Sequence, residues 1–321
     1  MNILITGGGG FIGGRLAKAL LARGQLCGAI ISRITLLDGA FPAPAQRDGR
    51  LEAVTGDISD PQVVKRVAGP ETDAVFHLAA VVSGAAEADF DLGMRVNLEG
   101  SRLLLESLRR CSKPPRLVFA SSVAAFGGAL PPVIEDSTPP APLTSYGTQK
   151  VIGEFLVSDY SRKGFIDGRS LRLPTIVVRS GKPNAAASSF ASGIVREPLN
   201  GLVSECPVGP ETSVWLLSPR LVVEAFIHAL ELRDGALGTQ RTVNLPGITA
   251  TVTEMLEALA RVAGAETAAR VRWKPDARVQ AIIGTFPTRF RTARALELGF
   301  RADDDVDSII RDYIADEQIN L

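Results

Sequence analysis

The 321-residue chain is poor in cysteine, in histidine and in net charge. Its three cysteines, Cys27, Cys111 and Cys206, are far apart and form no C-x-x-C pair. This argues against a disulfide framework or a zinc site and favours a reducing, cytoplasmic location. The two histidines, His77 and His228, have no cluster of carboxylates in the sequence around them, so we expect structural roles for both and no catalytic metal.

The 35 basic and 35 acidic residues cancel, which gives no electrostatic case for binding nucleic acid or an anionic membrane. No apolar run reaches the length of about 18 residues that would indicate a transmembrane helix. The N-terminus lacks a basic segment, and its apolar run ends at once in glycines, so we expect neither signal peptide nor anchor. Hydrophobic residues make up 45% and charged residues 22%, as in an ordinary globular protein.

The first half of the chain alternates short apolar runs with helical patterns. Such alternation implies right-handed βαβ crossovers and a mostly parallel sheet. We therefore expect an α/β fold, a Rossmann-type doubly wound parallel sheet. Strands are expected at 2–6, 32–38, 51–55, 74–77, 116–120 and 170–173, and helices at 11–22, 60–67, 85–110 and 145–162.

A glycine-rich turn follows the first expected strand directly and opens the first helix. It contains Gly7-x-x-Gly10-x-x-Gly13, and glycine lets backbone N–H groups approach a pyrophosphate at a helix N-terminus. We therefore predict a dinucleotide site that includes Gly7, Gly10, Phe11, Ile12 and Gly13.

Asp38 ends the second expected strand, about 25 residues after Gly13, at the distance typical of a ribose-binding carboxylate. A carboxylate there accepts hydrogen bonds from ribose hydroxyls and repels a 2′-phosphate, which favours NAD over NADP. Arg33, Arg47 and Arg50 are the residues that could reverse this preference, but no arginine directly follows Asp38.

Further cofactor contacts are expected where the next two strands end. Asp57 and Ile58 follow the third strand, where an adenine edge could be met. Leu78, Ala79 and Ala80 follow the fourth strand, and small residues there let the backbone approach the cofactor. Residues 1–175 are thus predicted to form the NAD-binding Rossmann domain.

The residue pattern of the sequence changes after about residue 175, where polar and proline-containing loops appear at 179–188 and 207–213. Residues 176–321 are predicted to form mainly a smaller substrate-binding lobe with segments that return to the sheet. Its expected elements are helices at 219–232, 253–262, 292–298 and 305–316 and a strand at 241–245.

Tyr146 and Lys150 lie four residues apart on an expected helix, which places both side chains on one face. A lysine in that position can lower the pKa of a tyrosine from its usual value near 10 and create a base for an alcohol proton. The pair is weak evidence alone, but it follows the glycine turn and an isolated Ser121-Ser122.

Together these motifs resemble the extended short-chain dehydrogenases/reductases of the NAD-dependent epimerase/dehydratase superfamily. The resemblance implies that Tyr146 is the general acid/base, that Lys150 also binds the nicotinamide ribose, and that Ser122 hydrogen-bonds the reacting oxygen. It implies a homodimer that pairs the helices at 85–110 and 145–162. It also implies cofactor contacts at Asn97, Ser121, Tyr146, Lys150, Pro174 and Thr175.

The sequence departs from the nucleotide-sugar enzymes of that superfamily after the strand at 170–173. Those enzymes often carry Arg-x-x-Asn-Val-Tyr-Gly-Pro, whereas residues 172–181 here contain no asparagine. Several later segments instead resemble dehydrogenases of four-carbon sugar acids, which implies NAD-dependent oxidation at C2 to the 2-oxo acid. The alternatives are a nucleotide-sugar epimerase or dehydratase with bound NAD, and a non-catalytic NAD-binding regulator.

A small sugar acid carries a carboxylate, so its pocket should offer a cation and hydrogen-bond donors. Arg179 and Arg220 are the candidate cations. The full set of expected substrate-binding residues is Ser83, Ser122, Tyr146, Thr175, Arg179, Asn184, Ser188 and Arg220.

Overall fold

The computed structural model describes residues 1–42, 48–181, 186–233 and 235–321. A seven-stranded sheet forms its centre, and each pair of neighbouring strands is parallel. Across the sheet the order is β12 (Thr242–Asn244), β8 (Asp167–Leu173), β7 (Arg116–Ser122), β6 (Ala74–His77), β1 (Asn2–Thr6), β4 (Arg33–Asp38) and β5 (Leu51–Thr55). This confirms the expected Rossmann-type sheet.

The strand order reverses at β1. The chain first adds β4 and β5 on one side of β1, and then returns to add β6, β7 and β8 on the other. In sheets of this kind, ligands bind where the order reverses, outside the carboxyl ends of the strands. The glycine turn after β1 and the loop after β6 lie at this point.

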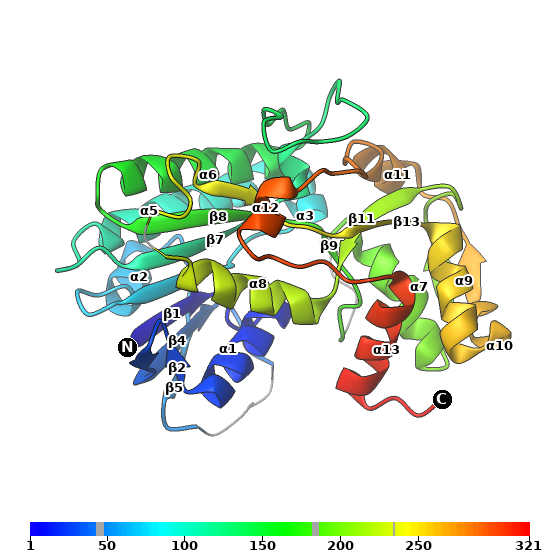
Figure 1. The fold of residues 1–321 in the computed structure, drawn as a ribbon, viewed down its shortest axis with the longest axis horizontal. Coiled ribbons are helices and arrows are strands. Elements are labelled where there is room, and N and C mark those ends of the chain that lie inside the picture. Colours follow the sequence, from blue (N-terminus) through cyan, green and yellow to red (C-terminus); the bar gives the residue numbers. More distant parts are fainter. Residues whose placement is uncertain (43–47, 182–185, 234) are drawn as a thin grey trace.

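Helices cover both faces of the sheet (Figure 1). Because side chains alternate along a strand, Ile3 and Ile5 of β1 pack on one face and Leu4 on the other. The face of Ile3 and Ile5 is covered by α1 (Phe11–Arg23) and α8 (Pro219–Glu231). The face of Leu4 is covered by α2 (Pro61–Val67), α5 (Gly100–Leu108) and α6 (Ser145–Arg162).

The expected single helix at 85–110 is wrong, because the chain breaks there into four pieces. They are α3 (Ser83–Ala88), α4 (Phe90–Gly93), the π-helix η1 (Met94–Glu99) and α5. Asp89 has extended backbone and its carboxylate caps α4 by accepting a hydrogen bond from the Leu92 N–H at 2.9 Å. Such wider π turns are frequent at functional sites, and this one contains Asn97.

The second half of the chain builds a smaller lobe with its own apolar core beside the sheet (Figure 1). The periodicity of the sequence gave no sign of its strands, because each has only two to five residues. These strands are β9 (Thr175–Ile176), β11 (Ser213–Leu217) and β13 (Ile248–Thr251) in one sheet, and β10 (Ser204–Cys206) and β14 (Val271–Trp273) in another. The lobe's helices are α7 (Ser189–Leu199), α9 (Val252–Ala263), α10 (Ala265–Ala268), α11 (Ala277–Ile283) and α13 (Val306–Glu317).

Segments of the second half also return to the main sheet. Strand β12 extends its edge beside β8, and α8 packs on its face. The short helix α12 (Ala293–Glu297) lies against β12. The remaining elements are the hairpin β2 (Gln25–Leu26) and β3 (Ala29–Ile30) and the 3-10 turn η2 (Val123–Ala125).

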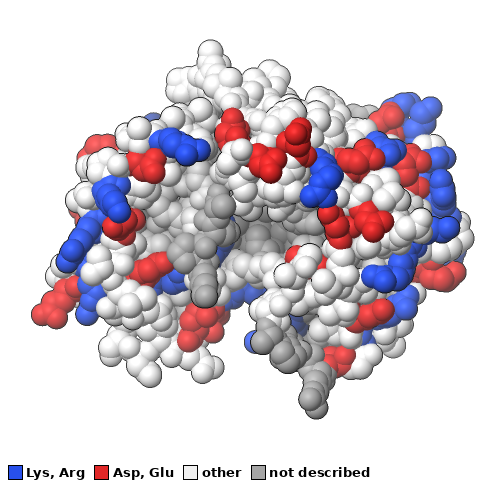
Figure 2. Space-filling model, turned by 180° about the vertical axis from the view of Figure 1, so that it is seen from behind, with Lys and Arg blue, Asp and Glu red and all other residues white. Residues whose placement is uncertain are grey.

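Acidic and basic side chains are interspersed on the face shown in Figure 2, which is hollowed near its centre. This mixture fits the formal net charge of zero. Within the described ranges, no helix combines the length and the apolar character needed to cross a membrane.

Candidate active site

The glycine turn after β1 brings backbone unusually close to the loop after β6. Gly7 has a φ of 74°, and a Cβ there would lie 2.7 Å from the Ala79 nitrogen. A Cβ on Gly13 would lie 2.2 Å from the Gly7 carbonyl oxygen. Helix α1 then begins after Gly10 with no side chain capping it. The turn therefore offers a cradle without side chains at a helix N-terminus, which suits a pyrophosphate.

Asp38 stands at the end of β4 and accepts a hydrogen bond from the Gly9 N–H at 3.0 Å. Two of the arginines that could have reversed the preference for NAD over NADP are paired elsewhere. Arg33 lies 3.9 Å from Glu52, and Arg50 lies 2.8 Å from Asp48. Neither lines the cleft beside Asp38. Arg47 lies outside the described residues. Neither Arg33 nor Arg50 therefore stands beside the Asp38 carboxylate at the edge of the cradle, an arrangement that suits NAD.

A cleft of about 570 Å³ runs from Asp38 to the carboxyl ends of β7 and β8. Its size suits a dinucleotide together with a small substrate. Most of the predicted site residues line it: Gly7, Gly10, Phe11, Ile12, Gly13, Asp38, Asp57, Ile58, Leu78, Ala79, Ala80, Ser83, Ser121, Ser122, Tyr146, Lys150, Pro174, Thr175, Arg179 and Ser188.

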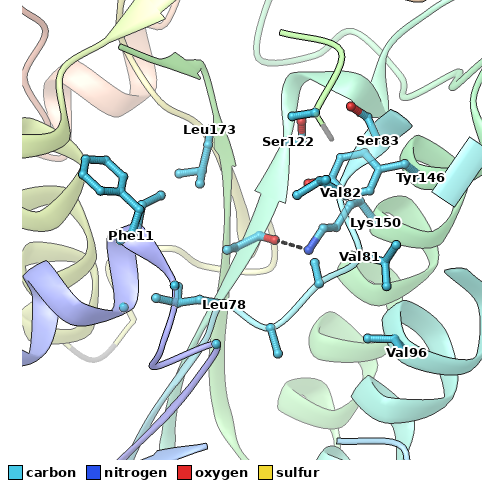
Figure 3. A pocket seen from close by; sticks show the side chains of 18 of the residues that line it. Phe11, Leu78, Val81, Val82, Ser83, Val96, Ser122, Tyr146, Lys150 and Leu173 are labelled. Atoms are coloured by element: carbon cyan, nitrogen blue, oxygen red, sulfur yellow. Dashed lines mark hydrogen bonds between the residues drawn. The ribbon is translucent and has the colours of Figure 1, made fainter. Parts of the chain in front are cut away.

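Sequence reasoning missed several lining residues. Val81, Val82 and Val96 form part of the apolar wall in Figure 3. Arg95 lines the cleft and pairs with Asp57, while Phe286 reaches it from the second lobe, about 100 residues after the other lining residues. Val81 and Val82 directly follow the predicted 78–80 segment and could have been found by extending it, but nothing in the sequence marked Val96 or Phe286.

A neutral hydrogen-bonded chain fixes the strand ends beneath the cradle. The Ser101 hydroxyl donates to the Asn97 carbonyl at 2.6 Å, so it accepts from His77 Nε2 at 2.8 Å. His77 Nδ1 then accepts from the Thr6 hydroxyl at 2.7 Å. Complete burial lowers the pKa of His77 to about 3, so the ring stays neutral. His77 is structural, as expected.

Asn97 does not line the cleft, although the resemblance implied a cofactor contact. Its side chain accepts from the Val81 N–H at 2.7 Å and donates to the Val81 carbonyl at 3.0 Å. It also donates to Gln149 on α6 at 2.7 Å. Asn97 therefore holds the wall segment after β6 against the helix that carries Tyr146 and Lys150.

Tyr146 and Lys150 lie together in the cleft (Figure 3). The Lys150 amine donates to the Ala120 carbonyl at 2.8 Å and lies 5.5 Å from the centre of the Tyr146 ring. Ser122 hydrogen-bonds the Tyr146 phenol. The three predicted catalytic side chains are thus brought to one place by the end of β7 and the first turns of α6.

Burial has the largest influence on the pKa values of Tyr146 and Lys150. It raises the pKa of Tyr146 to about 12, against the lowering effects of the Arg179 charge and the Ser122 hydrogen bond. It lowers the pKa of Lys150 to about 7, against the charge of Glu154. The sequence pointed to Lys150 as the cation that lowers the pKa of Tyr146. In the structure, the charge that lowers it is that of Arg179.

Arg179 reaches the same part of the cleft from the loop after β9. Its only side-chain hydrogen bond within the described part of the chain is a long one, 3.4 Å to the Ser188 hydroxyl, and no carboxylate there pairs with it. Burial lowers the pKa of this guanidinium, and the Tyr146 charge opposes that shift. A half-buried cation without an anion suits a substrate carboxylate.

The prediction for Arg220 needs correction. Arg220 lies at the start of α8, away from the cleft, and pairs with Asp312 at 2.7 Å and Asp316 at 2.9 Å on α13. Its charge is already satisfied at the surface. Asn184, also predicted to bind substrate, lies outside the described residues.

Comparison with known proteins identifies the family of the chain. The model of the "NAD dependent epimerase/dehydratase family" matches residues 3–240. The chain is 57% identical to a D-erythronate dehydrogenase of Cupriavidus necator, over 98% of both chains. It is 44% identical to a D-erythronate dehydrogenase of Haemophilus influenzae, over 98% of this chain and 99% of that one.

A solved structure described as the nucleoside-diphosphate-sugar epimerase from Agrobacterium tumefaciens superposes with a TM-score of 0.93. It is 43% identical and is matched over 99% of this chain and 94% of its own. With its glycine cradle, its ribose carboxylate and these relatives, the chain belongs to the NAD dependent epimerase/dehydratase family and is an oxidoreductase-type enzyme that uses NAD.

Proposed function

We propose that the protein oxidises D-erythronate at C2 to the 2-oxo acid, with Tyr146 as the general base. The observation that carries this proposal is the Arg179 guanidinium, which faces the cleft beside Tyr146 with no carboxylate partner in the described chain. A substrate with a free carboxylate next to its reacting hydroxyl would fill that position. The similarity to two D-erythronate dehydrogenases supports the same substrate.

NAD would be held by the glycine cradle, by the Asp38 carboxylate and by the segments that follow β6 and β8. The close approaches at Gly7 and Gly13 leave room there for a pyrophosphate but not for side chains. Bound NAD⁺ would supply the hydride acceptor for the carbinol carbon. Its positive ring would also favour the ionised form of Tyr146.

The chain's own residues handle the proton and the orientation of the substrate. Tyr146 takes the proton of the C2 hydroxyl, while Ser122, already hydrogen-bonded to the phenol, also binds that hydroxyl. Arg179 anchors the carboxylate and stabilises the phenolate by its charge. General-base catalysis of this kind is typically worth about 10²–10⁴-fold, and the rest comes from orientation.

The alternative is a nucleotide-sugar epimerase or dehydratase, which the description of the Agrobacterium relative would suggest. Residues 172–181 lack the asparagine that such enzymes often use. Arg179, which has no carboxylate partner among the described residues, also favours a small acid. A non-catalytic regulator would have no need for Ser122, Tyr146 and Lys150 brought together in one cleft.

The test is NADH formation over a panel of four-carbon and five-carbon sugar acids, simple 2-hydroxy acids and UDP-sugars. We expect turnover with D-erythronate, and thermal protection by NAD⁺ plus D-erythronate but not by UDP-hexoses. Turnover of UDP-sugars with no acid oxidised would overturn the proposal. Incubation with NADP⁺ in place of NAD⁺ provides the control for the role of Asp38.

We also propose that two copies associate through α5 and α6. Phe155 on the outer face of α6 is 64% exposed, and Phe90 on α4 is 58% exposed. Large exposed aromatic side chains are enriched at protein interfaces. Light scattering should give the mass of a dimer, and Phe155→Glu should yield a monomer. A wild-type mass equal to that of a single chain would contradict this.

A further inference from the structure

The catalytic face of α6 continues one turn beyond the residues that the mechanism uses. Tyr146, Lys150 and Glu154 follow at intervals of four, so all three project from one face of the helix. Glu154 is only 4% exposed. A buried carboxylate is rare unless it is paired, and no step proposed above involves this one.

Three hydrogen bonds hold the Glu154 carboxylate in place. Arg172 of β8 donates to it through two nitrogens, at 2.9 and 2.6 Å. The Ser121 hydroxyl, at the end of β7, donates to Oε1 of Glu154, the oxygen that also accepts from Arg172 Nε. Arg172 in turn donates to Asn244 of β12 at 3.3 Å, and its guanidinium lies 4.7 Å from the centre of the Phe126 ring. A bidentate pair with this support fixes the position and orientation of the carboxylate.

Lys150 has few other partners. Its amine donates to the Ala120 carbonyl and lies 4.8 Å from the centre of the Phe119 ring. The titratable groups linked to it directly are Tyr146 and Glu154 from its own helix and His77 from β6; Arg172 of β8 pairs with Glu154, and Arg179 acts on Tyr146. Tyr146 and His77 are neutral, and both arginines are cations. Glu154 is therefore the source of negative charge among these groups.

We infer that Glu154 is a positioning residue whose buried carboxylate favours the protonated form of Lys150 beside Tyr146, while Arg172 and Ser121 hold that carboxylate in place. The inference rests on the proposed roles of Tyr146 and Lys150. The influences on Lys150 agree with it: burial lowers the pKa of Lys150 to about 7, and the Glu154 charge opposes that shift. Without the Glu154 charge, a smaller fraction of Lys150 would be protonated near neutral pH.

The experiment is an NMR titration of protein labelled with ¹³C at the ε-carbon of lysine, without cofactor, with the Lys150 signal assigned by Lys150→Arg. Glu154→Gln keeps the shape of the side chain but removes its charge, and leaves Arg172 as an unpaired cation. We expect the midpoint of the Lys150 titration to fall by about 1 pH unit or more.

A second variant guards against misfolding of the first. Replacing both partners of a buried ion pair is usually better tolerated than removing one, so Glu154→Gln with Arg172→Met should fold. Its Lys150 midpoint should lie between those of wild type and Glu154→Gln, because the attracting and the repelling charge are both gone. Asp307→Asn, which breaks the partly buried Arg261–Asp307 pair of the second lobe, is the matched control and should leave the midpoint unchanged.

Equal Lys150 midpoints in wild type and Glu154→Gln would overturn the inference and leave Glu154 a purely structural residue; if Glu154→Gln does not fold, equal midpoints in wild type and the double variant would do so. In kinetics, we expect kcat of Glu154→Gln to fall at neutral and alkaline pH with no change in NAD⁺ affinity. The titration needs no substrate. A shifted midpoint in a protein that oxidises no sugar acid would therefore refute the proposed function and not the role of Glu154.

Discussion

The chain formed by Thr6, His77 and Ser101 and the cluster of Lys150, Glu154 and Arg172 are both buried beneath the same cleft, one made of neutral groups and the other of charges. Phe119 of β7 contacts both. Its ring centre lies 5.4 Å from that of His77 and 4.8 Å from the Lys150 amine. The two assemblies thus differ in chemistry although they occupy similar positions under neighbouring strands.

The difference follows from what each side has to do. The neutral chain fixes the strand ends and the loop beneath the cradle, and a group with a pKa of about 3 exchanges no proton near neutral pH. In the proposed mechanism, the phenol beside the charged cluster gains and loses a proton, and the pKa of the neighbouring Lys150 is about 7. The proposed function thus requires rigidity on one side and electrostatic control on the other.

The largest effect should come from removing the proton acceptor on the charged side. Tyr146→Phe keeps the ring and its packing but loses the hydroxyl, so kcat for D-erythronate should fall by about 10²–10⁴-fold. NAD⁺ affinity, measured by quenching of protein fluorescence, should change little. Near-normal turnover in this variant would remove Tyr146 from its role as the base.

The next effect tests the cation that acts on both substrate and tyrosine. Arg179→Met should raise the KM for D-erythronate by about 10–100-fold, the loss expected for a charge-assisted hydrogen bond. Because the Arg179 charge lowers the pKa of Tyr146, the rising limb of the pH–rate profile should also move to higher pH. Arg220→Met is the matched control, since Arg220 pairs with α13 outside the cleft. Equal KM values for the two variants would contradict the assignment.

Much of the fold and of the cofactor site followed from the sequence, because local rules govern them. A glycine turn between a strand and a helix can be recognised from neighbouring residues, and so can the Tyr146–Lys150 spacing on one helix. The strands of the main sheet were recognisable as apolar runs bounded by turns. Helix α6 begins and ends as expected, at Ser145 and Arg162.

The rest depended on contacts between distant segments. Nothing local distinguishes Arg179 from Arg220, and only tertiary structure shows that Asp312 and Asp316 neutralise the latter. Phe286 reaches the cleft from the second lobe through the same kind of long-range packing. The break in the expected 85–110 helix arises at Asp89, whose side chain competes with the helix by capping the next one.

Among stability effects, the largest should come from His77 at acid pH. An unfolded histidine binds a proton below about pH 6.5, whereas His77 in the folded protein stays unprotonated down to about pH 3. The free energy of unfolding is therefore unaffected by His77 above pH 6.5. Below that it falls by about 1.4 kcal/mol per pH unit, which amounts to about 2 kcal/mol at pH 5. Chemical denaturation at several pH values should show a shallower slope for His77→Gln. Equal slopes would mean that His77 protonates in the folded state.

The smallest effect should separate the two assemblies most cleanly. Ser101→Ala removes one hydroxyl from the neutral chain, so the free energy of unfolding should fall by about 1 kcal/mol, the net value of a typical hydrogen bond. The pH–rate profile should keep its shape, because His77 stays buried and neutral and no charge near Lys150 changes. Glu154→Gln should do the reverse and move the profile. If Ser101→Ala shifted the profile as well, the neutral chain would be coupled to proton transfer, and the two sides of the cleft would form one electrostatic unit.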